Sequence, residues 1–194
     1  MSESSATKGE RTRAKLTATA AELMQRQGYH ATGLAQIVEE SGAPRGSLYF
    51  HFPEGKEQMA AEAVRRLGEQ LGAALQAKLD GKPDVRSGLQ SVARMFARQL
   101  EASEFALGCP VATTALEASD EAPGLSTACA EVFERWTVVL AERIRRERPR
   151  IAAPERLART MLALIEGALL LARVRRSVEP LRDAELAIGT LLEG

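Results

Sequence analysis

Apolar residues recur every three or four positions along almost the whole chain, and this spacing constrains the fold more than any other feature. No stretch alternates apolar and polar residues with the period of two that a half-buried strand requires. Alanine, leucine, glutamate and arginine, which favour helices, are abundant. The sequence therefore predicts an all-α protein of about nine helices, expected near residues 7–27, 33–41, 44–50, 55–79, 85–102, 108–118, 125–148, 155–176 and 182–192.

The composition is that of an ordinary globular chain, with 45% hydrophobic and 27% charged residues. The longest apolar stretch, Met161–Ala172, contains Glu166 and is shorter than the roughly 20 residues that span a bilayer. Two cysteines are too few for a disulfide-stapled secreted domain, and no signal-like run opens the chain. We therefore expect a cytoplasmic protein with reduced thiols and no membrane segment.

The segment Leu34–Phe52 predicts a short helix, a tight break and another short helix. Gly42 and Ala43 form the break, and Pro44 suits the first position of the helix that follows. With a helix before it and a long helix after it, this order is that of a helix-turn-helix unit. The second helix of such a unit lies in the major groove of DNA. The segment therefore predicts DNA binding.

The helix after the break contains residue types suited to DNA. Arg45 lies at its exposed start, where arginine can bind guanine through two hydrogen bonds, and Gly46 lets the backbone approach closely. Thr32 is expected to cap the start of the helix at 33–41 and to donate to a phosphate. Basic residues also outnumber acidic ones in 8–15, although the chain has a formal net charge of zero. The predicted DNA-contacting residues are Arg11, Arg13, Thr32, Pro44, Arg45, Gly46, Ser47, Tyr49, His51 and Lys56.

Other interpretations of these residues stay open at this point. Tyr49 or Phe50 could belong to the core, His51 could be a surface histidine without a partner, and Arg45 could be a solvated charge. An adaptor that binds proteins through its helical faces would also explain the helices. It would not explain arginine, glycine and serine at the start of a turn-flanked helix.

The sequence offers no pattern for catalysis or metal binding. His30 and His51 are far apart, and neither Cys109 nor Cys129 has a cysteine or histidine near it in the chain. A phosphate-binding glycine loop is also missing from the sequence. We therefore expect no enzyme activity, no metal and no cofactor.

Two groups of residues resemble a known family. Gly28–Leu34, Ser41–Pro53 and Gly55–Glu57 resemble the N-terminal domain of TetR-family transcriptional repressors, over about residues 8–67. Gly108–Val111, followed by Ala115–Glu117, resembles the C-terminal domain of the LmrA/YxaF-like branch. The resemblance implies a homodimer that binds a palindromic double-stranded DNA operator and is released when a small-molecule inducer enters the C-terminal domain. It also implies that Arg45, Gly46, Ser47, Tyr49, His51 and Lys56 face DNA.

The expected domains follow from the helix order and this resemblance. Residues 8–55 form a helix-turn-helix DNA-binding domain, and the fourth helix, 55–79, connects it to a ligand-binding and dimerisation domain at 56–194. The ligand pocket is expected between the fifth to eighth helices, where Trp136 and Glu166 suit a hydrophobic or aromatic molecule. Glu166 could instead pair with Arg173 or another arginine, and most other candidates could be plain core. The candidates are Met95, Phe96, Gln99, Phe105, Cys109, Trp136, Met161 and Glu166.

The predicted helix at 155–176 is apolar nearly all round in its second half. Such a helix must be buried on all sides, and a chain of this size cannot easily surround it, so we expect a second copy to cover it. The eighth and ninth helices would form a four-helix bundle with those of the partner. The predicted interface residues are Leu162, Leu169, Ala172, Ile188 and Leu191.

Overall fold

The computed structural model describes residues 7–118 and 121–193. Over these residues it contains nine α-helices and no strand, so the predicted all-α class is confirmed. The helices are α1 (Lys8–Ala31), α2 (Leu34–Ser41), α3 (Ser47–His51), α4 (Lys56–Asp80), α5 (Val85–Ala102), α6 (Pro110–Glu117), α7 (Pro123–Glu147), α8 (Pro154–Arg175) and α9 (Glu179–Glu193). Within the described residues, every helix is too short or too polar to span a bilayer.

The helix α1 begins with a capping box. The Thr7 hydroxyl accepts the Glu10 N–H at 3.2 Å, and the Glu10 carboxylate accepts the Thr7 N–H at 2.6 Å. Gly28 adopts a φ of 85° and kinks the helix, which then continues for one more turn to Ala31. The helix is therefore longer than predicted, because the glycine bends it without ending it.

A positive-φ glycine and a short turn connect the two helices of the helix-turn-helix segment. Gly42, with φ 63°, ends α2, and the Ser47 N–H then bonds to the Pro44 carbonyl at 2.9 Å. Because residues 44–46 form this turn, α3 begins at Ser47, later than predicted. Leu48 and Phe52 are fully buried among apolar residues of α1, α2 and α4. This small cluster holds α3 in place.

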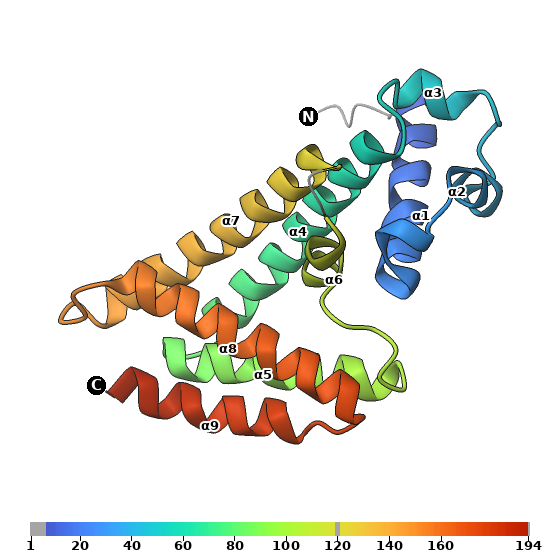
Figure 1. Cartoon of the computed structure of the whole chain (residues 1–194). Coiled ribbons are helices and arrows are strands. Elements are labelled where there is room, and N and C mark those ends of the chain that lie inside the picture. Colours follow the sequence, from blue (N-terminus) through green and yellow to red (C-terminus); the bar gives the residue numbers. More distant parts are fainter. Residues whose placement is uncertain (1–6, 119–120, 194) are drawn as a thin grey trace.

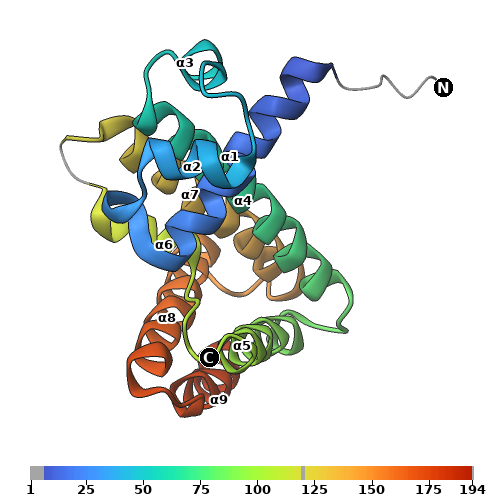
Figure 2. The ribbon, with the colours of Figure 1, turned by 90° about the vertical axis from the view of Figure 1, so that its right-hand side faces the viewer.

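Three groups of helices follow one another along the molecule (Figure 1). Helices α1 to α3, here called the head, gather at one end, and α5, α8 and α9 gather at the other. The long helices α4 and α7 run between them, and helices α4 to α9 together are called the body. Figure 2 shows α6 against the C-terminal end of α1. The larger hydrophobic cluster lies in the body but also includes Met24 and Tyr29 of α1. Since α1 and α4 contribute to both clusters, the predicted domain boundary near residue 55 stays a prediction.

The helices α4 and α7 pack closely at Gly68. A Cβ atom at this position would lie 2.4 Å from a Val132 methyl carbon, so only glycine allows the two helices to approach this far. The Trp136 indole N–H also donates to the Gly68 carbonyl at 2.9 Å. This contact fixes the direction in which α4 runs toward the head.

Gly68→Ala is expected to lower the free energy of unfolding by about 1–3 kcal/mol, because its Cβ would overpack against Val132. The measurement is chemical denaturation followed by circular dichroism. Gly9→Ala is the matched control, since a Cβ there meets only ordinary contacts at 3.7 Å or more. An equal or higher stability for Gly68→Ala would contradict the close approach.

Candidate DNA-reading surface and ligand pocket

The turn before α3 and the outer face of α3 form an exposed surface. Pro44, Arg45 and Gly46 are exposed, and Tyr49 and Phe50 expose 64% and 82% of their area. Neighbouring exposed aromatic side chains are a feature of interaction sites. The guanidinium of Arg45, the phenol of Tyr49 and the ring of Phe50 can therefore contact a molecule bound to this surface.

Phe50 was not among the predicted contact residues. The helical spacing could have identified it, because Leu48 and Phe52 lie four positions apart and both point inward. Of the three positions between them, 49 and 50 are directed outward and 51 is partly buried. Ser47 and His51 are partly buried: the Ser47 hydroxyl donates to the Pro44 carbonyl at 2.6 Å, and the His51 ring packs against Phe50.

The structure gives Arg13 a different role from the one predicted. Its guanidinium donates to the Glu62 carboxylate, with Nε 3.0 Å from Oε1, and to the His51 carbonyl at 2.8 Å. It also lies 4.8 Å from the centre of the Phe52 ring. The hydrogen bond to Glu62 raises the pKa of Arg13. Arg13 thus ties α1 to α3 and α4 with its charge neutralised, whereas Arg11 is exposed.

Thr32 does not cap α2, whose N-cap is Gly33. The Thr32 side chain is fully buried, and its hydroxyl donates to the Gly28 carbonyl at 2.7 Å. It therefore closes the end of α1 and has no free donor for a phosphate. The prediction failed because the helix before it extends through Ala31, so the threonine belongs to that helix end.

Lys56 lies at the junction between head and body. Its ammonium donates to the His30 carbonyl at 3.3 Å and stands 4.4 Å from the centre of the Tyr29 ring. Burial lowers the pKa of Lys56, and the nearby charge of Glu117 opposes this shift. A phosphate contact by Lys56 stays a prediction.

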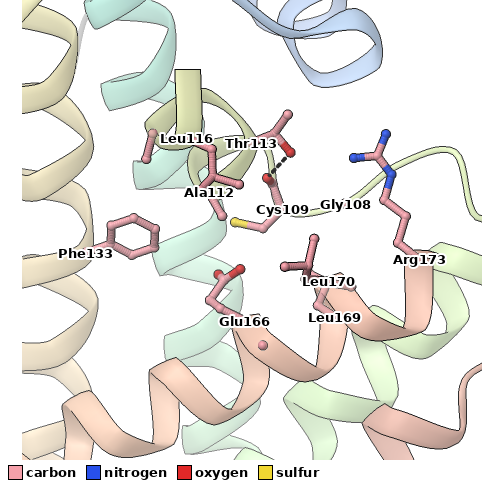
Figure 3. A pocket seen from close by; sticks show the side chains of 12 residues that line it. Gly108, Cys109, Ala112, Thr113, Leu116, Phe133, Glu166, Leu169, Leu170 and Arg173 are labelled. Atoms are coloured by element: carbon pink, nitrogen blue, oxygen red, sulfur yellow. Dashed lines mark hydrogen bonds between the residues drawn. The ribbon is translucent and has the colours of Figure 1, made fainter. Parts of the chain in front are cut away.

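An open cleft of about 400 Å³ lies between α6, α7 and α8 (Figure 3). Cys109 and Glu166 point toward one another inside it, and Phe133 of α7 forms one wall. Leu116 of α6 and Leu170 of α8 add apolar surface. The other lining residues are Gly108, Ala112, Thr113, Ala115, Gly167, Leu169 and Arg173. The cleft is therefore mostly apolar, with a carboxyl and a thiol inside it.

The buried Cys109 and the half-buried Glu166 are the polar element at the centre of the cleft. Burial raises the pKa of the Cys109 thiol, and the charge of Glu166 raises it further. Burial also raises the pKa of Glu166, and the neighbouring Cys109 side chain partly offsets this. Cys109 is therefore a protonated thiol at neutral pH. Among the described residues, no group of three or more His, Cys, Asp or Glu side chains could hold a metal ion.

A second, inner cavity of about 30 Å³ lies behind Glu166, which borders both spaces. Met95, Phe96 and Trp136 line it, together with leucine and valine side chains. The structure thus places five of the eight predicted pocket residues around the two spaces, and Cys109 and Glu166 are the two at the open cleft. The other three, Gln99, Phe105 and Met161, line neither space.

The three residues outside both spaces have other surroundings, and Gln99 of α5 is partly buried. Met161 is fully buried in the core, and the Phe105 ring lies 5.8 Å from the Arg176 guanidinium. Helical spacing could have located part of the true lining. Leu169, Leu170 and Arg173 lie three, four and seven positions after Glu166, on the same face of α8.

The outer face of α8 and α9 carries exposed apolar side chains. Leu171 exposes 50% of its area and Leu186 73%, and Val174 and Leu191 are also exposed. The predicted interface was wrong for Leu169, Ala172 and Ile188, which are buried within their own chain, while Leu162 is partly buried and lines the inner cavity. Neighbouring positions on a helix differ by about 100° in direction, so a shift of one or two residues separates core from surface.

Comparison with known proteins gives consistent matches. Residues 16–63 match the family of bacterial regulatory proteins of the tetR type, and residues 86–186 match the C-terminal domain of LmrA/YxaF-like transcriptional regulators. The HTH-type transcriptional regulator LmrA of Bacillus subtilis (strain 168) is 35% identical, covering 93% of this chain and 96% of LmrA. YxaF of the same organism, an uncharacterized HTH-type transcriptional regulator, is 37% identical, with 87% and 88% covered. Among solved structures, a TetR-family transcriptional regulator from Cytophaga hutchinsonii aligns with a TM-score of 0.85 at 25% identity, covering 98% of this chain and 97% of that one.

Both cysteines are expected to resist a disulfide reagent such as dithionitrobenzoate in the folded protein. Both are buried, and burial raises the pKa of Cys129 from its usual 9.0 to about 11, which leaves about a hundredfold less thiolate near pH 8. Because the folded pKa is raised, reactivity should increase only as the pH rises toward that value. Absorbance would be followed in native and urea-unfolded samples, and rapid native labelling would contradict the assignment.

Proposed function

Because the chain belongs to the TetR family of bacterial regulatory proteins, in its LmrA/YxaF-like branch, we propose that it is a ligand-responsive transcriptional repressor. Its family and its relatives are transcriptional regulators and not enzymes. In this proposal a homodimer binds a palindromic operator through its helix-turn-helix, and a small hydrophobic or aromatic molecule in the C-terminal domain releases it. Operator DNA is in the bacterial cytoplasm, so the protein acts there.

The surface around α3 supports the DNA contact most directly. Arg45, Tyr49 and Phe50 are exposed there, while Leu48 and Phe52 anchor the same helix in the core. An arginine at the start of a recognition helix can form two hydrogen bonds to a guanine edge. In a dimer, two such helices must lie about 34 Å apart to enter successive major grooves. A change in the relative position of head and body would alter this spacing.

The exposed apolar face of α8 and α9 supports the homodimer. Leu171, Val174 and Leu186 lie on neighbouring helices and would be buried if the same face of a second copy packed on them. Two helices from each chain would then form a four-helix bundle. The two-fold axis of this arrangement would place the two heads at the same height along the axis, on opposite sides of it.

The cleft around Cys109 and Glu166 supports a small-molecule site. It is large enough for a molecule of modest size, and most of its lining is apolar. A ligand that binds one spacing of the two heads more tightly than the other shifts the population toward that state. Release from the operator requires only this difference in affinity.

Arg45→Ala is expected to weaken binding to the operator by about 1–3 kcal/mol and to relax base preference at one position of each half-site. The measurement is fluorescence anisotropy or footprinting with DNA from upstream of the protein's own gene. Arg150→Ala is the control, because it removes an equally exposed charge far from α3. If the unsubstituted chain binds no such fragment, the proposal fails and the adaptor interpretation gains support.

Leu171→Arg is expected to turn the dimer into a monomer and to abolish operator binding, because it would bury an unpaired charge in the proposed bundle. Size-exclusion chromatography with light scattering measures the mass. Val138→Arg, at an exposed apolar position of α7, serves as the control. A Leu171→Arg protein that keeps the dimer mass would show that the interface lies elsewhere.

A further inference from the structure

The short helix α6 borders two different parts of the molecule. Its residues Ala112, Ala115 and Leu116 line the open cleft (Figure 3). Pro110, Val111 and Thr114 lie on its other side and pack against α1 and α4, leaving a gap there of only about 10 Å³. A molecule in the cleft therefore contacts a helix whose opposite face packs against α1 and α4.

Glu117, the last residue of α6, bonds to the kinked end of α1. Its carboxylate accepts the His30 backbone N–H at 2.8 Å, and its own carbonyl lies 3.1 Å from the His30 Nε2 atom. The carboxylate also occupies the space above Gly28, where a Cβ atom would stand 1.9 Å from Oε1. Gly28 is thus needed both for its positive φ and for the room it leaves to Glu117.

The position of Glu117 is reinforced by a positive charge. The Lys56 ammonium donates to the carbonyl of the same His30 that Glu117 contacts, and the charges of Lys56 and Glu117 interact. The end of α1, the start of α4 and the end of α6 therefore meet at one cluster. A movement of α6 cannot leave this cluster unchanged.

The other connection between head and body runs through α4, which is packed more closely than α6. The close contact of Gly68 with Val132 holds α4 to α7, and the Glu57 carboxylate accepts the Gly124 N–H at 2.6 Å near the head. By contrast, α6 has eight residues, no side-chain hydrogen bond at its N-cap, and an open cleft along one face. Of the two connections, α6 is the one that can shift with little disruption of packing.

We propose that Glu117 is the positioning residue that transmits occupancy of the cleft to the DNA-reading head. This inference rests on the proposed function. A molecule in the cleft displaces α6, Glu117 moves with it, and the hydrogen bond to His30 changes the angle of α1 relative to the body. Without the Glu117 carboxylate, the head still binds DNA but no longer responds to the cleft.

The test uses a tryptophan to fill the cleft, so no ligand needs to be known. Ala112→Trp places an indole in the cleft from α6 and is expected to weaken operator binding about tenfold. Thr113→Trp, from the next position of the lining, repeats the test if the first variant unfolds. Glu117→Ala alone should change operator affinity by less than about threefold, and in that background the tryptophan should have almost no effect.

Two further variants separate coupling from a merely structural contact. Glu117→Gln keeps an oxygen that can accept the His30 N–H, so it should restore most of the tryptophan effect that Glu117→Ala removes. Glu142→Ala, an exposed position of α7, should leave the tryptophan effect at full size. Equal weakening by Ala112→Trp with and without Glu117, or no weakening in either background, would overturn the proposal.

Hydrogen exchange supplies a readout that does not depend on DNA. Ala112→Trp and Glu117→Ala should each speed exchange of the His30 amide, whose N–H bonds to the carboxylate. Unchanged exchange in Ala112→Trp would overturn the link through Glu117 even if the operator is bound normally. Absence of operator binding by the unsubstituted chain would instead refute the repressor function itself.

Discussion

The contact of Gly68 with Val132 is the constraint on which the rest of the arrangement depends. It brings α4 against α7 more closely than any side chain at position 68 would allow, and the Trp136 indole closes the same contact with a hydrogen bond. Since α4 contributes Met59 and Ala63 to the core of the head, its direction determines where α3 points. The exposed Arg45 and Tyr49 therefore owe their position to packing far from them in the structure.

The sequence alone was enough to predict the helical class and the order of the elements, because apolar spacing is a local property. The four-residue spacing of Leu48 and Phe52 is also a local property, and it suits the inward direction that both side chains have in the structure. Arg13 could not be predicted in the same way. Its partner Glu62 is 49 residues away in the chain, and a basic residue near a DNA-binding helix looks the same whether it meets a phosphate or a carboxylate.

The candidate pocket shows a second limit of sequence patterns. Met161 and Leu170 are both apolar residues of the same helix, and the sequence does not distinguish them. In the structure Met161 is fully buried, whereas Leu170 lines the open cleft. Only the angles between α6, α7 and α8 decide which face of each helix is left uncovered. Those angles depend on packing among many residues, whereas the lone acid Glu166 was recognisable because a carboxyl in an apolar helix needs a reason.

The Cys109 thiol and the Glu166 carboxyl, which point toward one another, set a chemical condition for any molecule that passes beyond the open cleft. Glu166 separates the open cleft from the inner cavity, so a molecule that reaches the Met95 and Phe96 side must disturb this pair. A purely hydrocarbon molecule would leave the carboxyl without a partner, at the full cost of its desolvation. A molecule that carries a hydroxyl or an amine can replace the thiol. The pair would therefore select against purely apolar compounds that match the cleft only in shape. The selection would depend on the hydrogen-bonding groups of the ligand and not on its size.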